Sequence, residues 1–296
     1  MILIADSGST KTTWACIEPN AGTNTALHPI TSLGINPIRD NEETIVKAIE
    51  RARENLYQQA QIVSEAPFSP DHIKAVHFYG SGCIPPYSTT VKRILQRAYP
   101  RAEVSVESDM LGATLALCGH HEGIACILGT GSNSCLFDGQ QITQQTPALG
   151  FILGDEGSGA SLGKHLVADI LKRQLPVPLQ EAFTQETGLT QAEIINRVYR
   201  QPQPNRFLAS LTPFLERHRH EPSIHQLLVD EFRRFLSRNI RNYQRPDLPV
   251  NFVGGITASF RPELEEAIMA EGMQLGRILS QPIGGMADYF RLKIEN

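Results

Sequence analysis

The chain begins with a pattern of apolar and small polar positions that recurs later in the sequence. Residues 1–5 and 12–18 are short apolar segments, separated by a turn of glycine and small hydroxyl residues. This pattern predicts a β-hairpin. The same order of strand, turn and strand recurs from Ile127 to Asp138, where the turn reads Gly129-Thr130-Gly131-Ser132-Asn133-Ser134. The repeat, at a spacing of roughly 120 residues, predicts two similar half-domains.

Strand and helix periodicities alternate in the remaining sequence, which indicates an α/β fold. In the first half, strands are predicted at 25–30, 73–79 and 102–107, and helices at 41–61, 89–98 and 109–117. In the second half, a helix is predicted at 158–175, helical patterns at 189–243, a strand at 249–253, and helices at 261–271 and 283–292. A length of 296 residues suits two domains, which we expect at 1–120 and 121–296.

Composition and charge narrow the class of protein. The net charge of −4 does not favour binding to nucleic acid or to an anionic membrane. No apolar run approaches the roughly 20 residues of a membrane span, and the first residues do not resemble a signal peptide. The five cysteines contain no C-x-x-C pair, so we expect them to be buried, without a metal. These features predict a soluble, cytoplasmic protein.

The two glycine-rich turns are the first candidate site. Backbone N–H groups of such turns can point inward and bind an anion, although one turn by itself could be an ordinary hairpin. Two of them, in two similar halves, could face one phosphate chain, which points to a nucleotide-using enzyme. Further polar and glycine-rich clusters follow predicted strands or precede helices. They are residues 33–37, 107–113, 154–159 and 253–256.

These motifs, taken in order, resemble a known family. The segments LGTGSN, SDMLGA and GDEGS together are similar to the N-acetylglucosamine kinase group of the BadF/BadG/BcrA/BcrD ATPase family, in the sugar kinase/Hsp70/actin superfamily. The resemblance covers essentially the whole chain. It implies two ribonuclease H-like (actin-like ATPase) domains that flank a nucleotide and sugar cleft and close over ATP. It also allows the last helix, about residues 283–293, to pack back on the N-terminal domain, and it suggests a homodimer.

The resemblance implies roles for the two turns and for one carboxylate. Asp6 would hold Mg²⁺ through water, which suits an ion that binds few carboxylates besides phosphate oxygens; a simple turn-capping role is the alternative. Gly254 and Gly255 would lie against adenosine, unless they form a plain strand-to-helix turn. The ATP-binding residues that the resemblance implies are Gly8, Ser9, Thr10, Lys11, Thr130, Gly131, Gly254 and Gly255.

The catalytic and sugar-binding residues are also implied by the resemblance. Asp109 matches the general base that takes the proton of a sugar hydroxyl, expected to be O6, although it could merely cap its helix. Asn36 and Asp155 match residues that bind sugar hydroxyls, and a helix N-terminus would by itself also explain Asp155. Around the N-acetyl group the resemblance suggests Ser132, Asn133 and Gly150.

The first turn departs from the family pattern. Ser7 and Ser9 stand where glycines are more common, and Lys11 is unusual at its position. Three other functions stay open: an ATPase that drives a partner reductase or dehydratase, a non-catalytic sugar sensor, and a kinase for another small molecule. The first would need paired cysteine ligands, and the second usually adds a DNA-binding motif. The sequence leaves the physiological amino sugar and the activity of this copy undecided.

Overall fold

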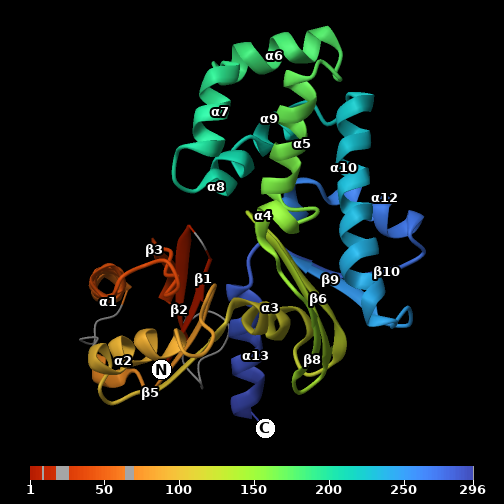
Figure 1. The fold of residues 1–296 in the computed structure, drawn as a ribbon. Helices are drawn as coiled ribbons and strands as arrows, with labels where there is room; N and C mark the ends of the chain where they lie inside the picture. The colour runs from red at the N-terminus through yellow and green to blue at the C-terminus, as the bar shows by residue number, and fades with distance from the viewer. Residues whose placement is uncertain (9, 18–26, 64–69, 296) are drawn as a thin grey trace. The chain divides into compact units, whose positions relative to one another are not determined.

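The computed structural model describes residues 1–8, 10–17, 27–63 and 70–295. The chain forms two compact units, one of Met1–Gly119 with Pro282–Asn296 and one of His120–Gln281 (Figure 1). The C-terminal helix therefore belongs to the first unit, although it follows the second in sequence. No helix among the described residues is long and apolar enough to cross a membrane.

The first unit is built on a mixed sheet with the strand order β3-β2-β1-β4-β5. β1 pairs antiparallel with β2 and parallel with β4, and β4 pairs parallel with β5. Its elements are β1 (Ile2–Ser7), β2 (Lys11–Ile17), β3 (Leu27–Leu33), α1 (Glu42–Val63), a 3₁₀ turn (Pro70–His72), β4 (Ala75–Gly80), α2 (Ser88–Ala98), β5 (Glu103–Ser108), α3 (Asp109–Cys118) and α13 (Ile283–Glu295).

The two faces of this sheet are covered by different helices. On one face, buried residues of α1 and α2 form a core with the strands, and this core includes Leu3, Ala5 and Trp14. α3 and α13 pack against the sheet and against each other. Phe290 of α13 stacks on His77 of β4, with ring centroids 4.2 Å apart. The closing helix of the chain is therefore part of the first unit's structure.

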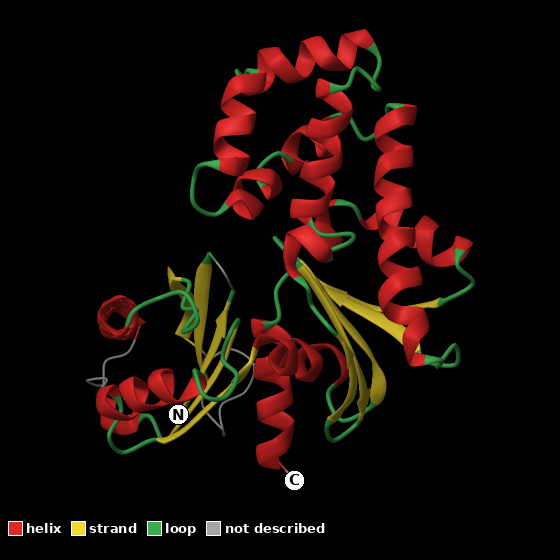
Figure 2. Cartoon of the chain, viewed as in Figure 1, coloured by secondary structure: helices red, strands yellow, loops and turns green. Residues whose placement is uncertain are grey.

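The second unit repeats the same sheet pattern, with the strand order β10-β9-β6-β7-β8. The hairpin β6–β7 is antiparallel, and β9 joins β6 in parallel. Its strands are β6 (Glu122–Leu128), β7 (Ser132–Asp138), β8 (Ile142–Thr146), β9 (Pro249–Val253) and β10 (Gln274–Leu279). The repeat predicted from the two hairpins is thus confirmed: the chain contains two mixed sheets with the same strand pattern (Figure 2).

Helices form most of the second unit outside its sheet. They are α4 (Gly150–Leu153), α5 (Gly159–Leu171), α6 (Val177–Thr187), α7 (Gln191–Tyr199), α8 (Pro204–Ala209), α9 (Thr212–Arg217), α10 (Pro222–Phe235), α11 (Gly255–Ser259) and α12 (Arg261–Ala270). α10 continues as a π-helical turn (Leu236–Ile240) and a 3₁₀ turn (Arg241–Tyr243). Residues of α5 and α10 share one buried core with β6 and β9.

Some elements differ from the sequence expectations. The strands β8 and β10 were not predicted, because their sequences ITQQT and QLGRIL are short, half-polar edge strands without a clear alternation. The helix expected at 158–175 ends at Leu171. The third strand, expected at 25–30, is found at Leu27–Leu33, and residues 25–26 lie outside the described residues.

Candidate active site

Three neighbouring parallel strands of the first unit end at the same edge of the sheet. Ser7 lies opposite Gly80, and Gly80 lies opposite Ser108, in the register of β1, β4 and β5. Ligands of α/β sheets bind outside the carboxyl ends of such strands. Asp6, Ser81 and Asp109 therefore occupy the edge where a ligand of this unit is expected.

Asp109 is the first residue of α3 and is held there by hydrogen bonds. The Met110 amide donates to its Oδ1 at 2.9 Å, and Ser108 caps the helix by accepting from the Leu111 amide at 3.2 Å. Burial raises the pKa of Asp109, while hydrogen bonds from the Met110 amide and the Ser81 hydroxyl lower it. A half-buried carboxyl group with a raised pKa is a group that can accept a proton from a substrate.

Asp6 lies near Asp109 and also titrates abnormally. Burial and, next to it, the negative charge of Asp109 raise its pKa from the ordinary 3.8 to about 7, against the positive charge of Lys11, which lowers it. Lys11 is an exposed residue at the start of β2. A cation bound beside these two carboxyl groups would stabilise their ionised forms.

Ser81 is a further candidate site residue, which no sequence motif pointed out. Its amide donates to the Ser7 carbonyl at 2.9 Å, and its hydroxyl donates to Asp109. Its loop, Gly80-Ser81-Gly82-Cys83, follows the strand predicted at 73–79. Only the parallel pairing of β4 with β1 and β5 brings its serine to the carboxylate.

The departure at Ser7 has a structural explanation. Its side chain is fully buried, and its Oγ lies 2.7 Å from Thr12 Oγ1. The same oxygen accepts from the Ile35 amide at 2.9 Å and donates to the Ile35 carbonyl at 3.1 Å. Ser7 thus ties the segment after β3 to the first turn, and its hydroxyl is already hydrogen-bonded within the protein. Ser9 lies outside the described residues.

Backbone contacts shape the first turn further. The Gly8 amide donates to the Lys11 carbonyl at 3.0 Å, and the Gly34 amide donates to the Thr10 carbonyl at 3.1 Å. Asn36 follows directly, and its Oδ1 accepts from the Ile38 amide at 3.0 Å. Asn36 packs against Gly82, within the loop that carries Ser81. The structure therefore brings the candidate sugar residue Asn36 into the neighbourhood of the first turn and of Ser81.

The second turn is attached to the beginning of α5. The Gly159 amide donates to the Gly129 carbonyl at 2.8 Å, and the Ala160 amide donates to the Thr130 carbonyl at 3.0 Å. The turn at Gly254, after the parallel neighbour β9, packs against the backbone of Leu128. Gly255 begins α11 beside open space. Residues 129–131 and 254–255 therefore lie together at one edge of the second sheet.

Asp155 lies beside the second turn in an unusual backbone conformation. Its φ is 60°, in the left-handed region, and its Oδ1 accepts from the Ser132 amide at 3.1 Å. Its carboxylate packs against Gly131. Burial raises the pKa of Asp155, the Ser132 amide lowers it, Glu156 raises it and Lys164 lowers it. The second turn and Asp155 thus form one hydrogen-bonded group.

The other three expected sugar residues lie in different surroundings. Ser132 and Asn133 are successive residues of β7, so their side chains point to opposite faces of the sheet. The Asn133 Oδ1 accepts from the Gln145 side chain at 3.0 Å and from the Ser134 amide at 2.9 Å. Gly150, with φ of 73°, begins α4 and has open space around its Cα. Ser132 joins the group around Asp155 through its amide.

No group of three or more His, Cys, Asp or Glu side chains in the described ranges is arranged to hold a metal ion. The described residues therefore offer no site in which protein side chains alone surround a metal ion. Magnesium that accompanies ATP needs only one or two carboxylates besides phosphate oxygens and water. Asp6 suits that kind of site, since its ionised form is destabilised by burial and by Asp109.

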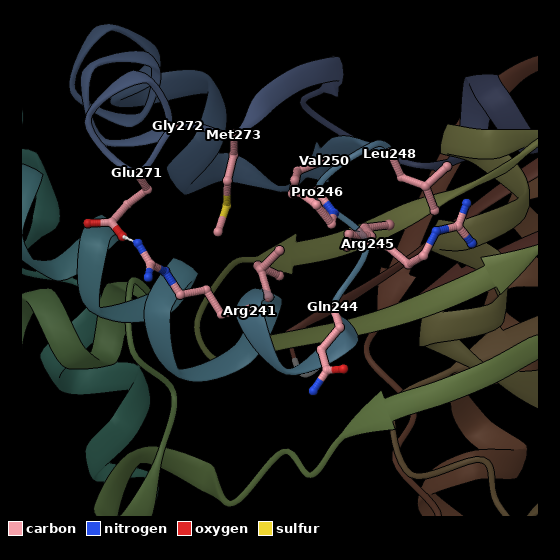
Figure 3. Close-up of a pocket in the computed structure, with 11 residues that line it drawn as sticks. Arg241, Gln244, Arg245, Pro246, Leu248, Val250, Glu271, Gly272 and Met273 are labelled. Atoms are coloured by element: carbon pink, nitrogen blue, oxygen red, sulfur yellow. Dashed lines mark hydrogen bonds and ion pairs between the residues drawn. The ribbon is translucent and has the colours of Figure 1, made fainter.

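Figure 3 shows a pocket of the second unit. Ile124, Leu248 and Val250 line it, at the beginnings of β6 and β9 rather than at their ends. Its charged residues are paired, for example Arg241 with Glu271 at 2.5 Å. We therefore do not regard this pocket as the active site.

Comparison with known proteins defines the class. A search against protein-family profiles finds no match. A Porphyromonas gingivalis protein, provisionally assigned as an N-acetylglucosamine kinase, is 43% identical, with a TM-score of 0.91 over 99% of each chain. A glucokinase of the ROK family from Streptomyces griseus, solved with glucose and AMPPNP, shares the fold, at 15% identity and a TM-score of 0.57 over 98% of each chain.

One curated relative matches part of the chain. It is the glucosamine kinase of Vibrio cholerae, 28% identical over 114 residues, and the match spans 38% of the length of each protein. The fold and the two turn-bearing sheets define a two-domain, actin-like sugar kinase. Within that class, the chain belongs to the family of the N-acetylglucosamine kinase-like protein from Porphyromonas gingivalis.

Proposed function

We propose that this sugar kinase transfers the γ-phosphoryl group of ATP to O6 of N-acetylglucosamine, with Asp109 as general base. The observation that carries the proposal is the position of Asp109 at the carboxyl ends of β1, β4 and β5, where burial raises its pKa and Ser81 orients it. The names of the similar kinases support an amino sugar as the acceptor.

Asp109 accepts the proton of the 6-hydroxyl as that oxygen forms its bond to the γ-phosphorus. The bond between phosphorus and the β,γ-bridging oxygen breaks, and ADP leaves with the bond's electron pair. In this class of reaction the protein mainly positions the reactants and neutralises charge. The hydrogen bonds from Ser81 and the Met110 amide keep the Asp109 carboxylate in one orientation while it accepts the proton.

The two turns bind the phosphates through their backbone amides. Ser9, Thr10 and Lys11 supply amides of the first turn, and Thr130 and Gly131 supply those of the second. The Gly8 amide is already bonded to the Lys11 carbonyl, so Gly8 contributes a backbone without a side chain beside the phosphates. Adenosine lies along Gly254 and Gly255, where no side chain at 255 obstructs it. Asp6 would hold Mg²⁺ through water, and the ion supplies charge neutralisation on the phosphate oxygens when it is bound.

Asn36 and Asp155 bind the sugar hydroxyls. The Oδ1 atoms of both residues already accept backbone hydrogen bonds. The Nδ2 group of Asn36 and the Oδ2 atom of Asp155 are therefore the atoms that we assign to the sugar. Ser132, Asn133 and Gly150 surround the N-acetyl group in this proposal. The hydrogen bond from the Gln145 side chain to Asn133 Oδ1 holds the Asn133 amide in place.

A second family activity, an ATPase that drives an electron-transfer partner, has less support. Such proteins hold an iron–sulfur cluster with cysteine ligands between subunits. The five cysteines of this chain are all buried, and each lies on a different strand, helix or loop. None of them is therefore available on the surface for a shared cluster.

The proposal is tested by measuring ADP release with Mg²⁺ and ATP across free sugars. The panel is N-acetylglucosamine, N-acetylmannosamine, glucosamine, glucose and 6-deoxy-N-acetylglucosamine. We expect the highest kcat/KM for N-acetylglucosamine, no sugar-dependent release with the 6-deoxy analogue, and a product whose phosphorus couples to the C6 protons in NMR. A product phosphorylated at another oxygen, or equal turnover with every sugar, would overturn the proposal.

A further inference from the structure

The segment from Glu156 to Ser161 connects Asp155 to α5, and one face of α10 holds it. The contacting residues of α10 and its π-helical extension are Glu231, Phe235 and Arg238, at positions i, i+4 and i+7. Residues with this spacing lie on one face of a helix. Each of the three contacts a different residue of the segment.

Glu231 forms the buried contact. Its Oε2 accepts from the Ser161 hydroxyl at 2.6 Å, and its side chain is only 5% exposed. Its Oε1 lies 3.2 Å from His165 Nε2 and 3.1 Å from Arg234 Nη1. A buried carboxylate needs such partners, because an unpaired one would be costly. Glu231 is thus fixed between α10 and the first turns of α5.

Phe235 forms the central contact, with Gly157. Gly157 has φ of 70°, and a Cβ atom placed on it would lie 3.0 Å from Phe235 Cβ. The backbone of the segment therefore lies directly on the fully buried Phe235. Only a residue without a side chain allows this close approach at a positive φ.

Arg238 forms the outer contact from the π-helical turn. Its Nε lies 2.5 Å from Glu156 Oε1, and the side chains are 61% and 13% exposed. π-Helical turns are rare and occur often at functional sites. An exposed ion pair contributes little to stability. The main effect of this ion pair is therefore to fix the position of Glu156, the residue next to Asp155.

The segment that these contacts hold is under strain and connected to the site. Asp155 keeps a left-handed φ of 60°, and such conformations persist only where the surroundings determine them. The amides of Gly159 and Ala160, in the same segment, donate to the second turn. A shift of the segment would therefore displace both the Asp155 carboxylate and the second turn.

We propose that Glu231, Phe235 and Arg238, here termed the α10 clamp, position Asp155 and the second turn for sugar and ATP binding. The inference rests on the proposed function, in which Asp155 binds the sugar. The clamp residues touch neither reactant, so they are positioning residues. Arg238 acts on Asp155 through Glu156, and Glu231 acts on the second turn through Ser161 and the start of α5.

Steady-state kinetics of Arg238→Gln, Glu156→Gln and the double variant test the clamp. We expect Arg238→Gln to raise the sugar KM roughly 10-fold, because small displacements of binding groups have effects of this size or larger. The ATP KM should change much less. In the Glu156→Gln background, Arg238→Gln should have no further effect, since the two residues share one contact.

Arg233→Gln is the matched control. Arg233 is another arginine of α10 with an ion pair at 2.9 Å, but its partner is Glu271, before β10. Equal sugar KM values for Arg238→Gln and Arg233→Gln would overturn the clamp and leave the proposed function intact. Additive effects in the double variant would also overturn it. A wild-type enzyme that phosphorylates no sugar would overturn both proposals.

Discussion

Asp6 and Asp109 are two acidic residues at the same edge of the first sheet, and the charge of Asp109 raises the cost of ionising Asp6. Asp6 carries the clearer consequence, because burial and Asp109 raise its pKa to about 7. The folded protein therefore holds a proton on Asp6 at a pH where the unfolded chain has lost it. Stability that depends on this proton is complete below about pH 4 and is lost as the pH rises through 7.

We predict that Asp6→Asn raises the Tm of the ligand-free protein by several degrees at pH 8 and leaves it almost unchanged at pH 4. The amide removes the buried negative charge without changing the shape of the side chain. Thermal unfolding followed by circular dichroism at the two pH values measures this. The exposed Asp288→Asn is the control. An Asp6→Asn effect of equal size at both pH values would argue against a raised pKa.

At the residue scale, the sequence alone could place Asp6 and Asp109 at strand ends in recognisable segments, and the structure has both at such ends, while their roles stay predictions. It could not predict Ser81 or the role of Ser7. The hydroxyl of Ser81 reaches Asp109 only through the parallel pairing of β4 and β5. Ser7 bonds to Ile35, 28 residues away, and no local pattern predicts that contact.

At the scale of elements, α13 shows how a distant segment supports the site. It packs on α3, whose first residue is Asp109. A Cβ on Gly285 of α13 would lie 2.5 Å from the Ala116 carbonyl oxygen, so the helices approach closely. Phe290 is buried and stacks on His77 of β4. α13 thereby fixes α3 against the strands that carry the candidate site.

We predict that Phe290→Ala lowers the free energy of unfolding by roughly 3–5 kcal/mol, as truncation of a buried aromatic residue does. Leu292→Ala, on the same helix but 54% exposed, should change it by less than about 0.5 kcal/mol. Denaturant unfolding of the three proteins measures both values. Equal, small changes would show that α13 does not stabilise the first unit.

The elements also show where sequence patterns stop being informative. The long amphipathic helices and the apolar strands were predictable from periodicity. The edge strands β8 and β10 were not, since only pairing with a neighbour orders such polar segments. The π-helical turn after Phe235 has no local signal either, and neither does its contact with Glu156.

At the scale of the whole molecule, the repeat of strand order explains why one motif pattern occurs twice. Each sheet contains an antiparallel hairpin, β1–β2 or β6–β7. The first strand of each hairpin also pairs in parallel with a later strand, β4 or β9. The sequence predicted this duplication because the two hairpin turns are similar and similarly placed. The identity of the sugar could not be predicted in the same way, because pocket shape decides between related hexosamines.

Residues proposed to act together belong to both units, so we predict closure when sugar and nucleotide bind. Closure would exclude water and limit wasteful ATP hydrolysis. Small-angle X-ray scattering should show a smaller radius of gyration with N-acetylglucosamine and a non-hydrolysable ATP analogue than without ligands. An unchanged radius at saturating concentrations of both would contradict this.

The central claim is sugar-dependent phosphoryl transfer with Asp109 as base, and one assay tests it most directly. Initial rates of ADP release with Mg²⁺, ATP and N-acetylglucosamine are compared for wild type, Asp109→Asn and Glu107→Gln. Glu107 is the matched control, an exposed acid two residues away on β5. We expect Asp109→Asn to lower kcat by about 10²–10⁴-fold with little change in the ATP KM, and Glu107→Gln to resemble wild type. ADP release that ignores the sugar, or an Asp109→Asn enzyme as fast as wild type, would contradict the account.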